Sequence, residues 1–370
     1  MTMNVKNLCV TVAFLLANQV GTSFGETIPF KSEQWEFSGK EAEVSEYKGQ
    51  NALFLHDAEA TLRDSEFADG TIEFDLLTLG DKGFSGVHWH LQDNGYDYEE
   101  FYIRPHQSGN LDANQYTPSF NGLAAWQIYY GPHYSVSLDY KIDDWMHVKI
   151  VVSGNQAEVY IDSNDPILFI DDLKGDFGSG KLRLRSGFAP AYFANFSYDA
   201  QERPALKGHA LEPEAPVENG VDHFYVSTPV AEDLVATATV ISVSQIPNDW
   251  VSLGVETNGI ANIARARQAS RATNTVFARV TINSDKVQTK RLNFGYSDRV
   301  RVFYEGRAIY SGNNGYMSRD YRYLGTVGLF DSVYLSLKTG DNDVYFAVSE
   351  NFGGWAIMAG FDDMDGISVR

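Results

Sequence analysis

Short runs of β-branched and aromatic residues alternate with clusters of Gly, Asn and Asp over residues 70–198. Almost no stretch there has the period of an amphipathic helix. Regularly spaced short strands with turn residues between them are typical of a β-sandwich or jelly roll. Residues 27–64 have the same texture, and we expect them to add edge strands. Within 70–198 the predicted strands are 71–77, 86–91, 99–104, 125–130, 147–153, 157–161, 181–185 and 192–198.

The composition changes over residues 199–220, where Pro recurs among Glu, Ala and Gly. Such a segment has few groups to bury and is typical of an interdomain linker. A second strand-rich stretch follows, in which residues 260–272 are rich in Ala and Arg and predict either a short helix or a basic loop. The strands predicted in this stretch are 236–243, 251–255, 275–282, 300–304, 344–348 and 356–361.

The sequence therefore predicts an all-β protein of two β-sandwich (jelly-roll) domains, residues 26–198 and 221–370, joined by a Pro/Glu-rich linker. A length of 370 residues with 44% hydrophobic residues supplies enough apolar material for two ordinary cores. The formal charge of −20 argues against nucleic acid and an anionic membrane surface as partners, because both attract Lys and Arg.

Residues 1–25 predict a secretory signal peptide, with Lys6 as the positive charge, an apolar run over 8–17 and small residues before the cleavage position. The apolar run is too short to span a bilayer, so no membrane insertion is expected after signal removal. The single cysteine, Cys9, lies inside this segment, which leaves no disulfide or thiolate site for the mature chain. We expect a secreted or periplasmic protein.

One face of the first predicted sandwich collects polar and aromatic side chains. Successive side chains of a strand point to opposite faces, so Val87, Trp89 and Phe101 should face the core while their neighbours face outward. Aromatic rings stack on sugar C–H faces and polar side chains bind hydroxyl or carboxylate oxygens, which predicts a ligand-binding face. The alternative is that these side chains form solvent-exposed cross-strand pairs and bind no ligand. The candidate ligand-binding residues on this face are His88, His90, Tyr102, Gln127 and Tyr129.

The same face also suggests an enzyme. A glycosidase normally needs a second carboxylate near the first, whereas a lyase needs a Tyr or His to move a proton and an Arg or Gln to hold a uronate. The lyase requirement is the better match to these side chains. The candidate catalytic residues are Glu99 or Glu100 with Arg104 and His106, assisted by Tyr102 and Gln127.

The first module resembles the concanavalin A-like lectin and glucanase superfamily over residues 30–198, particularly laminin-G-like and 3-keto-disaccharide hydrolase-type modules. The matching elements are Ser85-Gly86-Val87, Tyr98-Glu99 with 101–106, Asp144-Trp145 with 147–150, and Gly154, Ala157, Val159, Tyr160 and Ile161. The resemblance implies a sandwich but little about chemistry, because the superfamily mixes lectins, glycosidases, lyases and adhesion modules.

Two details of this resemblance bear on the site. The glucanase pattern of carboxylates is incomplete, because Glu73-Phe74-Asp75 lacks the second Glu. The family-like Tyr-Glu pair points to Glu99, whereas simple alternation places Glu100 beside Arg104; a β-bulge would reconcile them.

The second module resembles a galactose-binding-like jelly roll over residues 221–364, with Glu305-Gly306 at a turn followed by Leu337, Gly340 and Asn342. An aromatic and polar loop there could lie on a sugar, with Tyr316 and Arg319 as contacts, or could pack against the first module. The loop residues are Tyr310, Asn313, Asn314, Tyr316, Arg319, Tyr321, Arg322 and Tyr323.

Metal sites are not expected. His88 and His90 face the same way, but no further ligand follows at a recognisable spacing. Residues 93–97 resemble a calcium loop in composition; a polar turn is favoured, and a structural calcium ion stays open. The leading hypothesis is an exported protein that binds a polysaccharide or oligosaccharide on its first sandwich; the alternatives are a polysaccharide lyase or glycoside hydrolase using the same face, and a structural adhesion protein.

Overall fold

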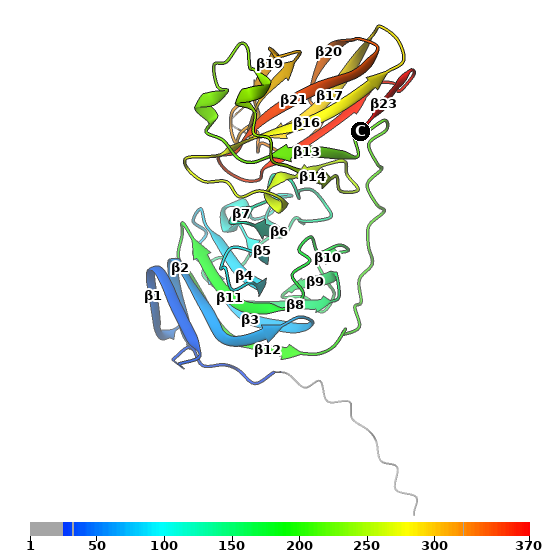
Figure 1. The fold of residues 1–370 in the computed structure, drawn as a ribbon. Coiled ribbons are helices and arrows are strands. Elements are labelled where there is room, and N and C mark those ends of the chain that lie inside the picture. The colour runs from blue at the N-terminus through cyan, green and yellow to red at the C-terminus, as the bar shows by residue number, and fades with distance from the viewer. Residues whose placement is uncertain (1–24, 32, 321) are drawn as a thin grey trace, which may run out of the picture.

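The computed structural model describes residues 25–370 except residues 32 and 321, so the predicted signal peptide lies outside the described residues apart from its last position. Regular structure in the described chain consists of β-strands and short 3₁₀ turns, arranged in two modules (Figure 1). The predicted all-β architecture is confirmed. In the same part of the chain no helix is long and apolar enough to cross a membrane.

The first module is one curled sheet, whose strands pair in the order β10-β9-β8-β3-β12-β2-β11-β4-β5-β6-β7, with β1 on β2. The predicted edge role of the N-terminal segment holds for β1, whereas β2 lies inside the sheet. β2 pairs with β12 near its start and with β11 towards its end, and so links the two halves of the sheet. The strands are β1 (Trp35–Tyr47), β2 (Gln50–Phe67), β3 (Gly70–Thr78), β4 (Phe84–Leu91), β5 (Tyr98–Ile103), β6 (Asn114–Phe120), β7 (Leu123–Ala124), β8 (Met146–Ser153), β9 (Gln156–Ile161), β10 (Leu168–Ile170), β11 (Gly180–Gly187) and β12 (Ala191–Ala200), and a 3₁₀ turn follows β5 (Pro105–Gln107).

The second module is a sandwich of two sheets, ordered β14-β13-β16-β21-β18-β19 with β23 on β16, and β15-β22-β17-β20. Phe294 of one sheet packs on Phe346 of the other with ring centroids 5.4 Å apart, which places the core between them. The strands are β13 (His223–Ser227), β14 (Trp250–Gly254), β15 (Ala261–Asn262), β16 (Thr275–Ser284), β17 (Gln288–Ser297), β18 (Arg299–Tyr304), β19 (Arg307–Asn313), β20 (Asp331–Leu337), β21 (Gly340–Ser349), β22 (Ala356–Phe361) and β23 (Ile367–Val369), with 3₁₀ turns at Glu232–Leu234, Val243–Gln245 and Ile263–Arg265.

The segment between the modules is extended and runs alongside the first module (Figure 1). It is held there by Glu158, a fully buried residue of β9 whose carboxylate accepts hydrogen bonds from the backbone N–H groups of Lys207 and Gly208 and from the Tyr160 hydroxyl. Two backbone donors of the linker thus share one buried acceptor, so this part of the linker has a fixed path.

The two modules are joined by a packed interface. Buried apolar residues of both belong to one continuous cluster. Gln127 of the first module makes four hydrogen bonds to the second: its backbone N–H donates to Gly353 O (2.9 Å), its carbonyl accepts from Val327 N (3.2 Å), and its side chain bonds Leu324 O (2.8 Å) and the Ser297 hydroxyl (3.0 Å). The relative position of the modules is therefore specified by directional contacts.

Two predicted strands are wrong. Residues 125–130 form a turn, in which the N–H groups of Ile128 and Tyr129 both donate to Ala125 O, while the backbone N–H and carbonyl of Gln127 bond to the second module and not to the sheet. Residues 236–243 are turns and loop with a single bridge from Val240 to Arg307. Residues 260–272, predicted as a short helix or a basic loop, contain β15 and one 3₁₀ turn followed by a loop.

Candidate functional site

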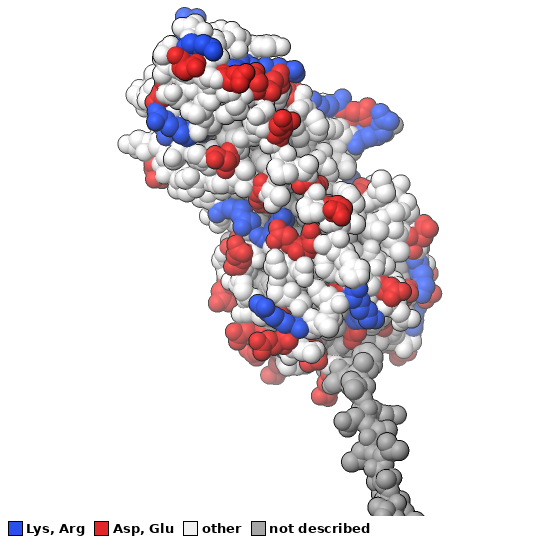
Figure 2. Space-filling model, turned by 90° about the vertical axis from the view of Figure 1, so that its right-hand side faces the viewer, with Lys and Arg blue, Asp and Glu red and all other residues white. Residues whose placement is uncertain are grey.

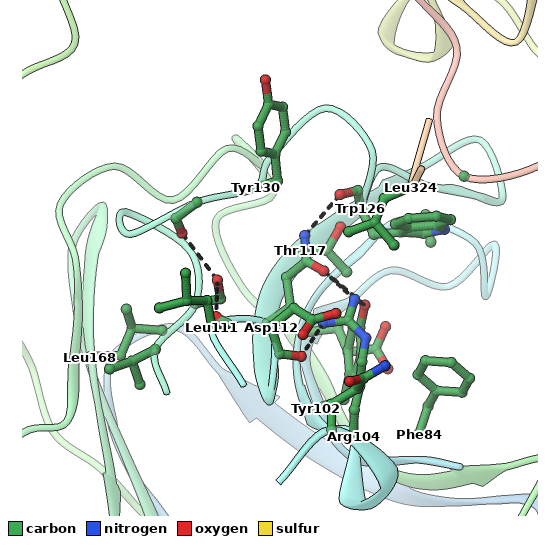
Figure 3. A pocket seen from close by; sticks show the side chains of 18 of the residues that line it. Phe84, Tyr102, Arg104, Leu111, Asp112, Thr117, Trp126, Tyr130, Leu168 and Leu324 are labelled. Carbon is green, nitrogen blue, oxygen red and sulfur yellow. Dashed lines mark hydrogen bonds between the residues drawn. The ribbon is translucent and has the colours of Figure 1, made fainter. Parts of the chain in front are cut away.

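A cleft of about 1280 Å³ opens between the sheet of the first module, the linker and the second module (Figure 3). Its floor comes from β4, β5, β6 and β11. The linker adds His209 and Leu211 to its wall, and the second module adds Tyr316, Leu324 and Phe352. The polar floor residues are Glu100, Tyr102, Arg104, Gln115, Thr117 and Arg185.

Strand alternation explains which side chains form the floor. β4 pairs with β5 in an unbroken register, with Val87 opposite Phe101 and His88 opposite Glu100. Val87 and Phe101 belong to the hydrophobic core, so the opposite pair lies on the outer face, where Glu100 lines the cleft. The bulge that would bring Glu99 to Arg104 is not formed. Glu100 shares the face of Arg104, and Glu99 lies on the other side of the strand.

Glu100 is ionised and paired. One of its oxygens lies 2.7 Å from the Arg185 guanidinium and 3.3 Å from Nε2 of His88, whose ring stacks on Tyr98 at 3.9 Å. Burial raises the pKa of Glu100, but Arg185 and His88 outweigh it and lower the pKa to about 2. The other oxygen, Oε2, has no hydrogen-bond partner among the described residues. The ionised carboxylate is therefore a hydrogen-bond acceptor and holds no proton to give.

Arg104 crosses the floor beside Glu100. Its terminal nitrogens donate to the backbone oxygen of Asp112 (2.8 Å), to the Tyr102 hydroxyl (2.7 Å) and to the Gln115 side chain. The guanidinium also lies 4.9 Å from the ring centroid of Tyr102 and 5.9 Å from that of Phe84. Gln115 donates in turn to Trp126 O at 2.8 Å, which ties the floor to the loop that carries the rim. These bonds fix the position of the guanidinium.

Three aromatic rings meet at the rim. Trp126 lies edge-on to Tyr316 and to Phe352, with centroids 6.0 and 5.6 Å away, and the latter two are 6.5 Å apart. Tyr316 and Phe352 are 39% and 53% exposed, so their faces are open to a ligand. Sequence reasoning identified Tyr316 but missed Trp126 and Phe352. These two residues come from different modules and meet only where the modules dock.

The remaining predicted residues divide between the cleft and other places. His106 lines the cleft, edge-on to Phe84 at 5.8 Å. His88 is buried beneath Glu100. His90 is buried away from the cleft, with Nε2 2.7 Å from Ala68 O, in a left-handed backbone conformation (φ 52°) at the end of β4 that breaks the alternation. The predicted placement of His90 beside His88 on one open face is therefore wrong.

The predicted contacts from the turn and the aromatic loop are also scattered. Gln127 and Tyr129 are buried at the module interface, where the Tyr129 hydroxyl donates to Glu256. Arg319 forms an ion pair with Asp331 at 2.6 Å outside the cleft. The aromatic loop thus both lines the cleft, through Tyr316, and packs against the first module. Tyr321 of this loop lies outside the described residues.

Glu99, the other candidate carboxylate, is fully buried. It accepts hydrogen bonds from the Tyr116 hydroxyl and from Gly175 N, both at 2.7 Å. Burial raises its pKa to about 7, against the opposing effect of these two donors. Glu99 therefore supports the core between β5, β6 and the 173–177 segment and does not reach the cleft.

This raised pKa makes folding stability pH-dependent. Glu99 has its full stabilising effect below its ordinary pKa of 4.5, and the effect is lost as the pH rises through about 7. The free energy of unfolding of the wild type should fall by on the order of 3 kcal/mol between pH 4.5 and 8 because of Glu99, and Glu99→Gln should lack this fall. Urea unfolding at several pH values measures both. Exposed Glu41→Gln is the matched control. A pH profile unchanged in Glu99→Gln would contradict this assignment.

Metal ligands do not gather in the described chain, where no group of three or more His, Cys, Asp or Glu side chains could hold an ion. In the segment that resembles a calcium loop, the Asn94 side chain accepts hydrogen bonds from Tyr96 N and Asp97 N, as in a polar turn.

No protein-family model and no curated protein sequence matches the chain. Among solved structures, the carbohydrate-binding module CBM66 from Bacillus subtilis is 14% identical, covering 45% of this chain and 96% of that chain with a TM-score of 0.35. A Bacillus subtilis protein of unknown function with a galectin-like fold is 14% identical (49% and 99%, TM-score 0.37), and the Bacillus licheniformis β-glucanase is 13% identical (49% and 100%, TM-score 0.35). The chain is thus similar both to a carbohydrate-binding module and to a β-glucanase.

Proposed function

We propose that this protein is an exported carbohydrate-binding protein that holds a saccharide chain in the cleft between its modules. The observation that carries the proposal is the pairing of an aromatic rim with a floor of fixed, buried hydrogen-bonding groups. Sugars present apolar C–H faces and polar hydroxyl edges, and a cleft with both kinds of surface matches them. Export rests on the signal-like residues 1–25.

The chemistry of the floor favours holding over cutting. Glu100 is ionised because Arg185 and His88 hold its pKa at about 2, so it accepts hydrogen bonds from hydroxyl groups and does not act as a general acid. The competing enzyme is a lyase, in which Tyr102 and His106 of the same cleft would move the proton. An adhesion protein is disfavoured because the second module borders the cleft without filling it.

Incubation with a panel of neutral and uronate polysaccharides separates these functions. We expect retardation in gels that contain a bound polysaccharide, with no new reducing ends and no absorbance from unsaturated products. Unsaturated products would replace the binding proposal by a lyase. An absence of both retardation and products across the panel would contradict the proposal that the protein binds carbohydrate.

The rim gives the first mutational test. Trp126→Ala removes the central ring of the three, and we expect the affinity for the retarding polysaccharide to fall about tenfold or more, since an aromatic anchor contributes about 1.4–2 kcal/mol or more. Trp145→Ala is the control, because Trp145 lies outside the cleft and donates to Lys48 O. Equal affinity of the Trp126→Ala protein and the wild type, as measured by affinity electrophoresis, would show that the rim does not contribute to saccharide binding.

A further inference from the structure

The floor of the cleft holds a buried cation without a carboxylate partner. Arg104 is 7% exposed, and among the described residues no Asp or Glu oxygen lies within ion-pair distance of its guanidinium. Its four recorded hydrogen bonds go to neutral oxygens: two backbone carbonyls (Asp112 and Asn114), the Tyr102 hydroxyl and the Gln115 amide oxygen. Burying a charge without a counter-charge is costly, so the position has a cost that a ligand could offset.

The neighbouring Arg185, unlike Arg104, has a carboxylate partner. Arg185 lines the same floor but is neutralised by Glu100 at 2.7 Å. The two arginines lie on one face of the sheet, and only the Arg185 side of it is internally balanced among the described residues. A negatively charged ligand group would therefore gain the most binding free energy beside Arg104.

The other charges of the cleft lining cancel, so its net positive charge is that of Arg104. Lys82 and His106 line the cleft beside Phe84, and burial, Lys82 and Arg104 together lower the pKa of His106. The charged side chains of the lining are Lys82, Arg104 and Arg185 against Glu100 and Asp112, a formal balance of +1. The chain as a whole carries −20, and its acidic groups are spread over both modules (Figure 2).

The surroundings of Arg104 are suited to a sugar carboxylate or sulfate. The guanidinium lies against the rings of Tyr102 and Phe84 (Figure 3), and its hydrogen bonds fix its plane before a ligand arrives. A preorganised guanidinium binds an anion with less loss of side-chain entropy than a mobile one. Asp112 also lines the cleft, but Arg104 bonds its backbone oxygen and forms no ion pair with its carboxylate.

We propose that the cleft is specific for an anionic saccharide, and that Arg104 is the residue that binds its carboxylate or sulfate group. This inference rests on the proposed function and adds the class of ligand to it. The rim rings would stack on sugar rings, and the Glu100–Arg185 pair would bind hydroxyl groups of a neighbouring unit.

The test compares three matched oligosaccharides by calorimetry at low salt: a uronate chain, the same chain with its carboxyl groups reduced to alcohols, and a sulfated form of the reduced chain. We expect the uronate or the sulfated form to bind the wild type about tenfold or more tightly than the neutral form, since a charge-assisted hydrogen bond contributes about 1.5–3 kcal/mol. The form that gains the affinity identifies the anionic group.

Arg104→Gln should lose this preference and bind all three forms with the neutral form's affinity. Arg183→Gln is the control, because Arg183 lies on the same strand as Arg185 but is paired with Glu59 at 3.0 Å outside the cleft. Should Arg104→Gln fail to fold, the wild type alone decides: its preference for the anionic form should shrink at least severalfold between about 0.05 and 0.5 M salt, because screening weakens charge pairing.

The outcomes separate the two proposals. Equal affinity for all three oligosaccharides, or a preference retained in folded Arg104→Gln, overturns the anionic specificity and leaves carbohydrate binding in place. A preference that does not respond to salt also overturns it. Binding of none of the three, together with no retardation on the polysaccharide panel, contradicts carbohydrate binding itself.

Discussion

Replacing Glu100 by Leu should lower the free energy of unfolding by about 3–5 kcal/mol, because it leaves the charge of Arg185 without a partner at the floor of the cleft. Glu100 is 1% exposed, and its pairing with Arg185 outweighs burial and lowers its pKa to about 2. Urea unfolding followed by tryptophan fluorescence measures the effect.

The control for this prediction is the neighbouring pair of Glu59 and Arg183, which lies outside the cleft and whose carboxylate is 36% exposed against 1% for Glu100. Glu59→Gln should cost about 1 kcal/mol or less, as surface pairs do. The double variant Glu100→Leu/Arg185→Leu should recover part of the loss, since it removes both charges. A Glu100→Leu protein as stable as Glu59→Gln would mean that solvent reaches Arg185 freely and the floor is not desolvated.

The pH dependence of the Glu100 pair has the opposite sign to that of Glu99. A lowered pKa gives stability that is present above the ordinary value of 4.5 and is lost as the pH falls through about 2. Glu99, with its raised pKa, loses stability in the other direction. Adjacent residues of one strand therefore titrate oppositely, because one faces a guanidinium and the other faces the core.

Local alternation predicted the floor of the cleft. The two-residue period of β5 places Glu100, Tyr102 and Arg104 together, and the pairing of β4 with β5 keeps that period intact. Resemblance to a family pointed to Glu99 instead, and the unbroken register shows that alternation was the better guide. The prediction for His90 was wrong because the chain adopts a left-handed conformation at that residue, which periodicity alone does not reveal.

The rest of the site depends on long-range contacts that no local pattern contains. Residues 125–130 look like a strand because they are aromatic and apolar, yet they form a turn in which Gln127 bonds to the second module. The linker was predicted from composition, but its place in the cleft wall depends on the buried Glu158, which binds Lys207 and Gly208. Trp126 and Phe352 are more than 200 residues apart and meet only because the two modules dock.

Gln127 connects the docking of the two modules to the aromatic rim of the cleft. Its side chain bonds Leu324 O and the Ser297 hydroxyl, and Trp126, its neighbour in the chain, carries the central ring of the rim. We expect Gln127→Ala to lower the free energy of unfolding by about 2–4 kcal/mol, because it leaves buried polar groups of the second module unpaired. We also expect calorimetry to show one unfolding transition for the wild type and a broader or split transition for Gln127→Ala, in which the modules are less coupled.

A positioning role predicts a second effect that loss of stability alone would not cause. At a temperature where Gln127→Ala is fully folded, its affinity for the bound saccharide should fall several-fold, because the Trp126 ring is no longer held against Tyr316 and Phe352. Gln201→Ala is the control, since Gln201 is exposed in the linker. Undiminished affinity of folded Gln127→Ala would show that the rim keeps its arrangement without the interface bonds, and that Gln127 contributes to stability and not to binding.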